Sequence, residues 1–234
     1  MKCIALSDFH GQLINIKEKF DLLLICGDFT PTWLPNRQQE WAWANNEFVE
    51  WINNLPYKDY NSRVVLIAGN HDFQLESISK KKKDEWLSKM SGRLIYLDND
   101  SFYHLDQETG KVIHIFGCPY CKELKGWAFC RPLERLDKYY NPIPNDVDIL
   151  MLHDAPDIMH GGVSTQLVPN RDFGNKLLAE YVLDRKPQIV LFGHIHTSPI
   201  KEFTPYMDDK VMCNVSILDE NYKIAYKPKT FILD

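Results

Sequence analysis

The stretch that decides the fold reads Val-Val-Leu-Ile-Ala-Gly-Asn-His-Asp at residues 64–72. Its five apolar residues predict a strand buried on both faces, and the glycine after them allows a tight turn. Asn70, His71 and Asp72 then bring side chains that bind metals or move protons. A buried strand that ends in such groups indicates an α/β protein with its ligand site at the carboxyl ends of strands.

The same pattern, a short apolar run followed by metal-capable side chains, occurs at four other places: residues 3–6, 22–26, 149–152 and 189–192. The side chains that follow these runs are Asp8, His10, Asp28, His153, His194 and His196. Because the carboxyl ends of parallel strands meet at one edge of a sheet, we expect them to converge with Asn70. Carboxylates, imidazoles and an amide carbonyl without a thiolate suit divalent Mn, Fe, Zn or Ni.

The remaining apolar patterns predict further strands and helices. Additional strands are expected at residues 95–97, 112–116, 211–217, 223–226 and 230–233, with a hairpin turn at residues 108–110. Helical spacing of apolar residues covers residues 37–55, 77–90 and 172–184, and Asp172 is the expected cap of the last helix. Residues 118–147 contain four prolines and no clear period, which is typical of a functional irregular segment.

Composition and charge exclude several classes of protein. The 234 residues are 44% hydrophobic and 25% charged, which excludes a disordered chain. A net charge of −5 argues against coating of nucleic acid or of an anionic membrane by charge alone. The apolar runs are far shorter than the roughly 20 residues of a membrane span, and no secretory signal is recognisable. We expect a cytoplasmic protein whose six cysteines are reduced.

The motifs together resemble a known family. Asp8-Phe9-His10, Gly27-Asp28, Gly69-Asn70-His71-Asp72, His153 and Gly193-His194-Ile195-His196 resemble the signature of the calcineurin-like metallophosphoesterase superfamily. The resemblance implies a four-layer α/β/β/α sandwich of two mixed sheets flanked by helices. It implies one domain over residues 1–234, with residues 118–147 as an insertion that borders the cleft.

The resemblance also implies a dinuclear metal centre. By motif matching, one divalent ion would be held by Asp8, His10, Asp28 and His196, and the other by Asp28, Asn70, His153 and His194. Mn²⁺ is the expected metal, with Fe, Zn, Ni or Mg as alternatives. A hydroxide that bridges the metals would attack phosphorus, and His71 would protonate the leaving oxygen.

A narrower resemblance concerns residues outside the ligand set. The segments Gly117-Cys118-Pro119, Gly126-Trp127-Ala128-Phe129, Asn214-Val215-Ser216 and Asn221-Tyr222 look like the metallophosphoesterase-domain (239FB-like) branch. That branch implies a phosphodiesterase acting on small phosphate esters such as cyclic nucleotides. Residues 29–32 lack the Asp-Arg-Gly of protein serine/threonine phosphatases, which disfavours a phosphoprotein substrate and leaves open what orients His71.

Substrate contacts are expected from segments that border the cleft. Trp127 and Arg131 are the first candidates, and Trp127 could either stack on a base or pack the insertion onto the sandwich. The other candidates are Trp33, Arg135, Tyr139, Tyr140 and Arg171. The expected partner is a small phosphate ester, with no membrane and no extended nucleic-acid surface, and the oligomeric state is left open.

Two other functions remain as alternatives. One is a non-catalytic metal-binding scaffold on the same fold, which the presence of His71 and all seven ligand candidates disfavours. The other is a thiol oxidoreductase, because Cys118-Pro119-Tyr120-Cys121 matches the glutaredoxin dithiol motif, although it lies mid-chain after a strand. Four consecutive lysines at residues 80–83 are interpreted as a solvated helix face rather than a phosphate site.

Overall fold

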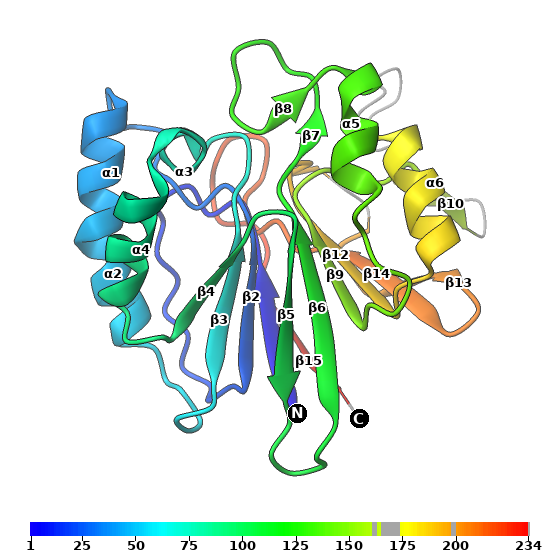
Figure 1. The fold of residues 1–234 in the computed structure, drawn as a ribbon, viewed down its shortest axis with the longest axis horizontal. Helices are drawn as coiled ribbons and strands as arrows, with labels where there is room; N and C mark the ends of the chain where they lie inside the picture. Colours follow the sequence, from blue (N-terminus) through cyan, green and yellow to red (C-terminus); the bar gives the residue numbers. More distant parts are fainter. Residues whose placement is uncertain (161–162, 165–173, 198–199, 234) are drawn as a thin grey trace.

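The computed structural model describes residues 1–160, 163–164, 174–197 and 200–233, without the side chains of residues 159–160 and 163–164. Two large β-sheets stand face to face, and helices cover the outer face of each (Figure 1). This arrangement is the four-layer α/β/β/α sandwich that the resemblance implied.

The first large sheet has five strands in the order β15-β1-β2-β3-β4. Strands β1 to β4 are parallel to their neighbours, and β15 pairs with β1 in the antiparallel direction. Its strands are β1 (Lys2–Leu6), β2 (Leu22–Cys26), β3 (Arg63–Ile67), β4 (Leu94–Leu97) and β15 (Lys229–Ile232). The predicted buried strands at residues 3–6, 22–26 and 64–68 are therefore confirmed to within one residue at each end.

The second large sheet has six strands in the order β13-β14-β12-β9-β6-β5. Strands β14, β12, β9 and β6 are parallel, and the edge strands β13 and β5 are antiparallel to their neighbours. Its strands are β5 (Asp100–Leu105), β6 (Val112–Cys118), β9 (Ile149–Leu152), β12 (Ile189–Phe192), β13 (Thr204–Met207) and β14 (Lys210–Asn214). The hairpin between β5 and β6 turns at the predicted place, where the Gly110 N–H donates to the Asp106 carbonyl.

The helices divide between the two outer faces. Figure 1 shows α1, α2 and α4 beside the first sheet and α5 and α6 beside the second. The helices are α1 (Arg37–Asn45), α2 (Glu47–Asn53), α3 (Phe73–Ser77), α4 (Lys80–Ser88), α5 (Leu133–Tyr140) and α6 (Lys176–Arg185). Two short strand pairs complete the described structure: β7 (Cys121–Lys122) with β8 (Cys130–Arg131), and β10 (Met159–His160) with β11 (Val163–Ser164).

Three apolar layers hold the sandwich together. The first lies between the helices and the first sheet and contains Phe29, Phe48 and Trp86, with the two phenylalanine rings 4.6 Å apart. The second lies between the sheets, where small and aliphatic side chains such as Cys3 and Met151 pack. The third lies between the second sheet and helices α5 and α6. Strands buried on both faces explain the continuous apolar runs.

The predicted helix over residues 37–55 is wrong in one respect, because two helices replace it. Asn46 separates α1 from α2, with φ −116° and ψ −79°. The Asn45 and Asn46 side-chain amides donate to the Trp41 and Ala42 carbonyls, which is how asparagine competes with regular helix. The predicted apolar stripe nevertheless faces the core, since Ala44 and Phe48 are both fully buried.

Three other expectations need correction. Residues 223–226 form no strand. Ile224 is 56% exposed and makes one isolated bridge to Leu218, so burial of an apolar face does not stabilise a strand there. The cap of α6 is Asn175, whose side chain accepts from Leu178 N, while Asp172 lies outside the described residues. The predicted irregular segment 118–147 contains β7, β8 and helix α5.

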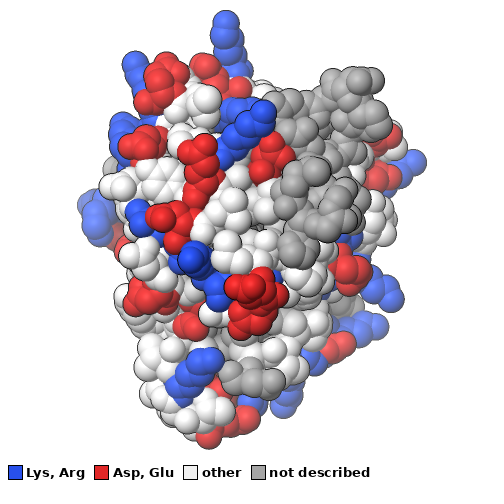
Figure 2. Space-filling view, turned by 90° about the vertical axis from the view of Figure 1, so that its right-hand side faces the viewer, with Lys and Arg blue, Asp and Glu red and all other residues white. Residues whose placement is uncertain are grey.

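None of the helices in the described part of the chain has the length and apolar character that crossing a membrane requires. On the face shown in Figure 2, acidic and basic side chains are interspersed. The lysines at residues 80–83 begin α4, where Lys80 pairs with Asp84 at 2.7 Å and Lys81 with Glu85 at 3.9 Å. These i,i+4 pairs support the interpretation as a solvated helix face.

Candidate metal centre

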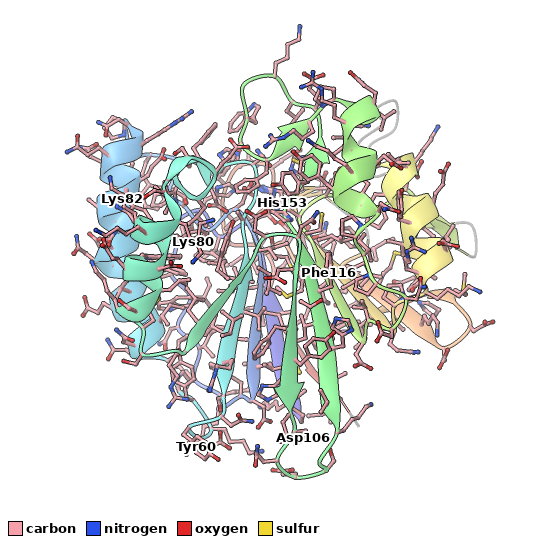
Figure 3. All side chains as sticks on the ribbon, in the orientation of Figure 1. Tyr60, Lys80, Lys82, Asp106, Phe116 and His153 are labelled. Carbon is pink, nitrogen blue, oxygen red and sulfur yellow. The ribbon has the colours of Figure 1, made fainter. Side chains whose placement is uncertain are left out.

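The seven predicted ligand residues lie together where strands of both sheets end. They follow β1, β2, β3, β9 and β12, and His153, labelled in Figure 3, lies near the meeting point of the two sheets. Three groups of side chains hold ligand atoms within 4.8 Å of one another: Asp8, His10, His196; His10, Asp28, His71; and Asp8, Asp28, His153. We call the seven side chains the pocket floor. Their role as ligands remains a prediction.

The backbone under the pocket floor is strained. Asp8, His10, Asp28 and His194 all have a positive φ, between 42° and 66°. Side chains other than glycine rarely adopt this left-handed conformation, at a cost of order 1–2 kcal/mol per residue. Strain of this kind persists at functional sites, where the surrounding structure holds it in place. Here it turns each side chain inward from the end of its strand.

Two glycines leave room for the ligand side chains. A Cβ atom at Gly69 would lie 2.3 Å from Asp28 Oδ1 and 2.5 Å from His153 Cε1. A Cβ atom at Gly193 would lie 2.2 Å from Ser7 Oγ and 2.4 Å from Asp8 Oδ2. Glycine is therefore required at both places because the carboxylates pack directly against the backbone.

One side of the pocket floor combines carboxylates with two imidazoles. His196 Nε2 lies 3.5 Å from Asp8 Oδ1, and His10 Nε2 lies 3.8 Å from Asp28 Oδ2. His196 Nδ1 faces the Asp219 carbonyl at 2.9 Å, which leaves Nε2 directed at the carboxylate. Asp8 in turn accepts the His194 N–H with both oxygens, at 3.1 and 3.0 Å.

The other side is organised around the side-chain amide oxygen of Asn70, Oδ1. It lies 2.9 Å from His153 Nε2 and 2.8 Å from His194 Nδ1. His153 Nε2 is also 3.5 Å from Asp28 Oδ1, while its Nδ1 faces the Cys26 carbonyl at 2.9 Å. Oxygen acceptors thus lie beside both ring nitrogens of His153. Burial alone would lower its pKa, but Asp28 and Asp8 raise the pKa of His153 to about 10.

The pocket floor fits a bound divalent cation. Both ring nitrogens of His10 lack a hydrogen-bond partner although its side chain is 1% exposed. An unpartnered buried imidazole is costly unless a ligand completes it. Burial lowers the pKa of His10 to about 4, so the ring is neutral and its lone pair is free. Burial opposes ionisation of Asp28, but His153 and His71 outweigh it and hold its pKa well below the usual range.

Asp72 and Asp154 support the segments around the pocket floor. Asp72 turns away from His71 and accepts the N–H groups of Asp28, Thr30 and Gly69, at 2.9, 3.0 and 2.7 Å. It therefore fixes the turns that carry the floor. Backbone carbonyls face the Nδ1 atoms of His153 and His196, while Asp154 accepts from Asn175 Nδ2 at 2.7 Å.

His71 lies above the pocket floor. Its N–H donates to Asp28 Oδ1 at 2.8 Å, its Nε2 is 4.0 Å from Asp28 Oδ2, and its side chain is 17% exposed. The Trp127 ring lies 4.3 Å from the His71 ring. This packing and the backbone bond position His71, in place of a supporting carboxylate. Burial lowers the pKa of His71.

A pocket of about 240 Å³ opens over the floor. Its walls include Leu124, Trp127 and Tyr222, which we call the aromatic wall although one member is aliphatic. Tyr222 lies 5.0 Å from His10 and 5.2 Å from His196, measured between ring centres. Sequence reasoning did not assign Tyr222 or Leu124 to the site; Asn221-Tyr222 entered only as a family motif.

The other predicted substrate contacts do not line this pocket. Arg131 Nη2 pairs with Glu76 at 2.8 Å, and Trp33 is 59% exposed elsewhere. Tyr139 stacks on Tyr120 at 3.7 Å, and Tyr140 is buried in the third apolar layer. Arg135 is exposed on α5, and Arg171 lies outside the described residues. Of the predicted contacts within the described part of the chain, only Trp127 lines the pocket.

The dithiol motif of residues 118–121 does not form a thiol pair. Cys118 is buried with its Sγ 4.0 Å from the Tyr139 carbonyl, while Cys121 Sγ lies 2.8 Å from Cys130 Sγ. The motif follows strand β6 and does not begin a helix. The geometry therefore disfavours a glutaredoxin-like oxidoreductase.

Known proteins are similar to this chain in sequence. The family model described as calcineurin-like phosphoesterase matches residues 1–198. Metallophosphoesterase domain-containing protein 1 of Homo sapiens is 28% identical over 212 residues, covering 82% of this chain and 60% of the human protein. A UPF0046 protein of Caenorhabditis elegans is 29% identical, covering 84% of this chain and 51% of that protein. The chain thus spans about half to 60% of the length of these curated relatives.

Solved structures share the sandwich at low sequence identity. Phosphopantetheinyl hydrolase from Mycobacterium tuberculosis superposes with a TM-score of 0.54 and 13% identity, covering 94% of this chain and 90% of that one. A putative 5′-nucleotidase from Staphylococcus aureus gives 0.52 and 12%, covering 91% and 48%. The first curated relative carries the name of the branch that the sequence resembles. With a family match over most of its length, the chain belongs to the calcineurin-like phosphoesterases.

Proposed function

We propose that this chain is a metal-dependent phosphohydrolase that cleaves small phosphodiesters, cyclic nucleotides among them. The observation that carries the proposal is the pocket floor, where the buried His10 imidazole has no hydrogen-bond partner and lies near two carboxylates. Family membership and relatives named for phosphoester hydrolysis support the same reaction class.

Two divalent cations bound at the floor would supply Lewis-acid activation of water and charge stabilisation at phosphorus. Asp8, His10, Asp28 and His196 would hold one, and Asp28, Asn70, His153 and His194 the other. The donors are nitrogen and oxygen atoms with no thiolate, which suits Mn²⁺ first and Fe, Zn, Ni or Mg as alternatives. The Cys26 carbonyl faces His153 Nδ1, and the Asp219 carbonyl faces His196 Nδ1. These contacts leave the Nε2 atom of each ring to bind a cation.

A diester fits the pocket better than a monoester. Among its described lining residues there is no lysine or arginine, so the chain adds no positive charge beyond the histidines. A diester carries one negative charge, whereas a monoester carries up to two. The limited volume and the Trp127 and Tyr222 rings favour a small ester with a planar group, which stacks on an aromatic face.

His71 is the proposed proton donor to the leaving oxygen. It lies above the floor, is partly exposed to the pocket, and its backbone is fixed by Asp28. Burial lowers its pKa, and an anionic ester bound beside it would raise that pKa again, since negative charge favours the protonated ring. General acid catalysis of this kind contributes roughly 10²–10⁴-fold.

The test is hydrolysis of bis-p-nitrophenyl phosphate by the full chain, freed of metal by a chelator and then supplied with Mn²⁺. We expect turnover that depends on Mn²⁺ and is unaffected by Cys121→Ser. A panel of 2′,3′- and 3′,5′-cyclic nucleotides and matching monoesters then defines the substrate. Metal binding without hydrolysis of any ester would support the scaffold alternative.

A further inference from the structure

The pair Cys121 and Cys130 lies at the base of the loop that carries the aromatic wall. These residues are register partners in the short parallel pair β7 and β8, and their Sγ atoms are 2.8 Å apart. A disulfide bond is about 2.05 Å long, so a small movement joins the two sulfurs. Figure 1 shows both strands above the strand ends that form the site.

We infer that Cys121 and Cys130 form an oxidation site, at which a small hydroperoxide converts the two thiols into a disulfide that closes the loop between them. The pair is distinct from the Cys118-Cys121 motif, whose first thiol points toward Tyr139. Cys118 is fully buried among the side chains between the second sheet and α5.

The two thiols are unequal in a way that suits the reaction. Cys130 is 8% exposed and Cys121 is 0% exposed, so Cys130 is the member that a small oxidant reaches. A hydrogen bond from Cys121 lowers the pKa of Cys130, whereas burial raises the pKa of Cys121. The thiolate is the nucleophile in such chemistry, which makes Cys130 the attacking sulfur and Cys121 the resolving one.

The chemical step balances with hydrogen peroxide as the oxidant. The Cys130 sulfur attacks one peroxide oxygen, the O–O bond breaks, and a sulfenic acid and one water form. The Cys121 sulfur then displaces the hydroxyl group, forming the S–S bond and a second water. In sum, two thiols lose two electrons and two protons, and one peroxide becomes two waters.

The backbone already holds the loop base in place. Phe129, next to Cys130, has a φ of 52°, and its N–H donates to Glu76 while its carbonyl accepts from Cys121. The loop also touches the site, because the Ala128 N–H donates to the backbone carbonyl of Asn70 and the Trp127 ring packs on His71. A disulfide therefore fixes a segment that forms one wall of the pocket without unfolding it.

The first test needs no activity. The full chain is reduced, exposed to hydrogen peroxide, and its free thiols are alkylated in denaturant before peptide mapping by mass spectrometry. We expect two of the six cysteines to escape alkylation, joined as a 121–130 cross-link. Closing so short a loop raises the melting temperature by about 5 °C.

Single variants separate the pair from its neighbour. Cys130→Ser and Cys121→Ser should each abolish the cross-link, and Cys118→Ser, a buried thiol in the same segment, should retain it. If Cys121→Ser does not fold, the unaltered chain and Cys130→Ser still decide the question. Alkylation of all six cysteines after peroxide, or a cross-link that includes Cys118, would overturn the inference.

The effect on the pocket rests on the proposed function and is measured separately. With the loop base fixed, fewer loop arrangements compete with the one that places Trp127 over His71, so KM for an aryl diester should fall about twofold with kcat unchanged. A complete cross-link with unchanged KM would refute the link to the pocket. Absence of any hydrolysis by the reduced chain would refute the proposed function, while the mapping and melting results would still decide the oxidation site.

Discussion

The pocket floor and the aromatic wall meet in one pocket but are built in different ways. The floor comes from the ends of buried strands, and every ligand candidate is fixed by backbone contacts and close packing. The wall comes from irregular segments, and Trp127, Leu124 and Tyr222 are each about 40% exposed. Rigid strand ends suit groups that must hold a fixed geometry, and exposed loops suit groups that select a ligand. We therefore propose that the floor carries the chemistry and that the wall selects the substrate.

The largest effect is expected from Asp28→Asn, which removes the charge shared by both halves of the floor. Three imidazoles lie within 4.0 Å of this carboxylate. We expect loss of bound metal, measured by elemental analysis, and a fall in diester turnover of about 10³-fold. Asp209→Asn, at an 80% exposed carboxylate, is the control and should change neither quantity. If Asp28→Asn keeps its metal and its turnover, Asp28 is not a metal ligand.

The next effect concerns His71, which lies above the floor and is the proposed proton donor. His71→Ala should keep its metal and lose turnover by about 10²-fold on a diester with a poor leaving group. On bis-p-nitrophenyl phosphate the loss should be smaller, because p-nitrophenolate leaves without protonation. Comparing the two substrates in steady-state kinetics tests the role, and an equal loss on both would contradict it.

A smaller effect is expected at the wall. Trp127→Ala should raise KM for a diester with a planar group about 10-fold, since stacking on one aromatic face contributes roughly 1–3 kcal/mol per base. The kcat and the metal content should change little. Trp33→Ala, at a tryptophan that is 59% exposed and does not line the pocket, is the matched control. If both variants behave alike in steady-state kinetics, the wall does not select the substrate.

The smallest effect on turnover is expected behind the floor, at Lys201. Its Nζ donates to Asn214 Oδ1 and the Ser216 carbonyl, both at 2.9 Å, and Asn214 in turn donates to the Ile195 carbonyl between two floor histidines. Burial lowers the pKa of Lys201 to about 8. The unfolded chain therefore binds the Lys201 proton more tightly than the folded chain does. The contribution of Lys201 to the free energy of unfolding grows as pH rises from 8 toward 10.5, and it is lost below pH 8.

Urea unfolding of the wild type and Lys201→Met at pH 7 and pH 9.5 measures this contribution. The wild type should gain about 2 kcal/mol relative to the variant over that interval. Diester turnover at pH 7 should be almost the same in both proteins. A parallel change in both unfolding curves would show that Lys201 does not titrate in this way.

The sequence predicted much of the floor because strand ends carry their own signal. An apolar run and a metal-capable side chain are neighbours in the chain, so five such segments can be recognised separately, three of them with a glycine between the two. Because the carboxyl ends of parallel strands meet at one edge of a sheet, the five segments are expected to converge. The helix over residues 37–55 shows the limit of periodicity: the apolar stripe was right, but two adjacent asparagines broke the helix by bonding their own backbone. The predicted strand at residues 223–226 is wrong because Ile224 is 56% exposed and does not pack into an apolar layer.

The sequence alone predicted an α/β protein and the residues that form the floor, since both depend on short patterns that local chemistry enforces, and its motifs resemble the family and the sandwich that were then found. Only the tertiary structure decided which partners those residues meet. Asp72 supports the turns of the floor instead of His71, Tyr222 reaches the pocket from the far end of the chain, and Cys121 pairs with Cys130 instead of Cys118. These contacts depend on loop paths, which are set by packing between segments that lie far apart in the sequence.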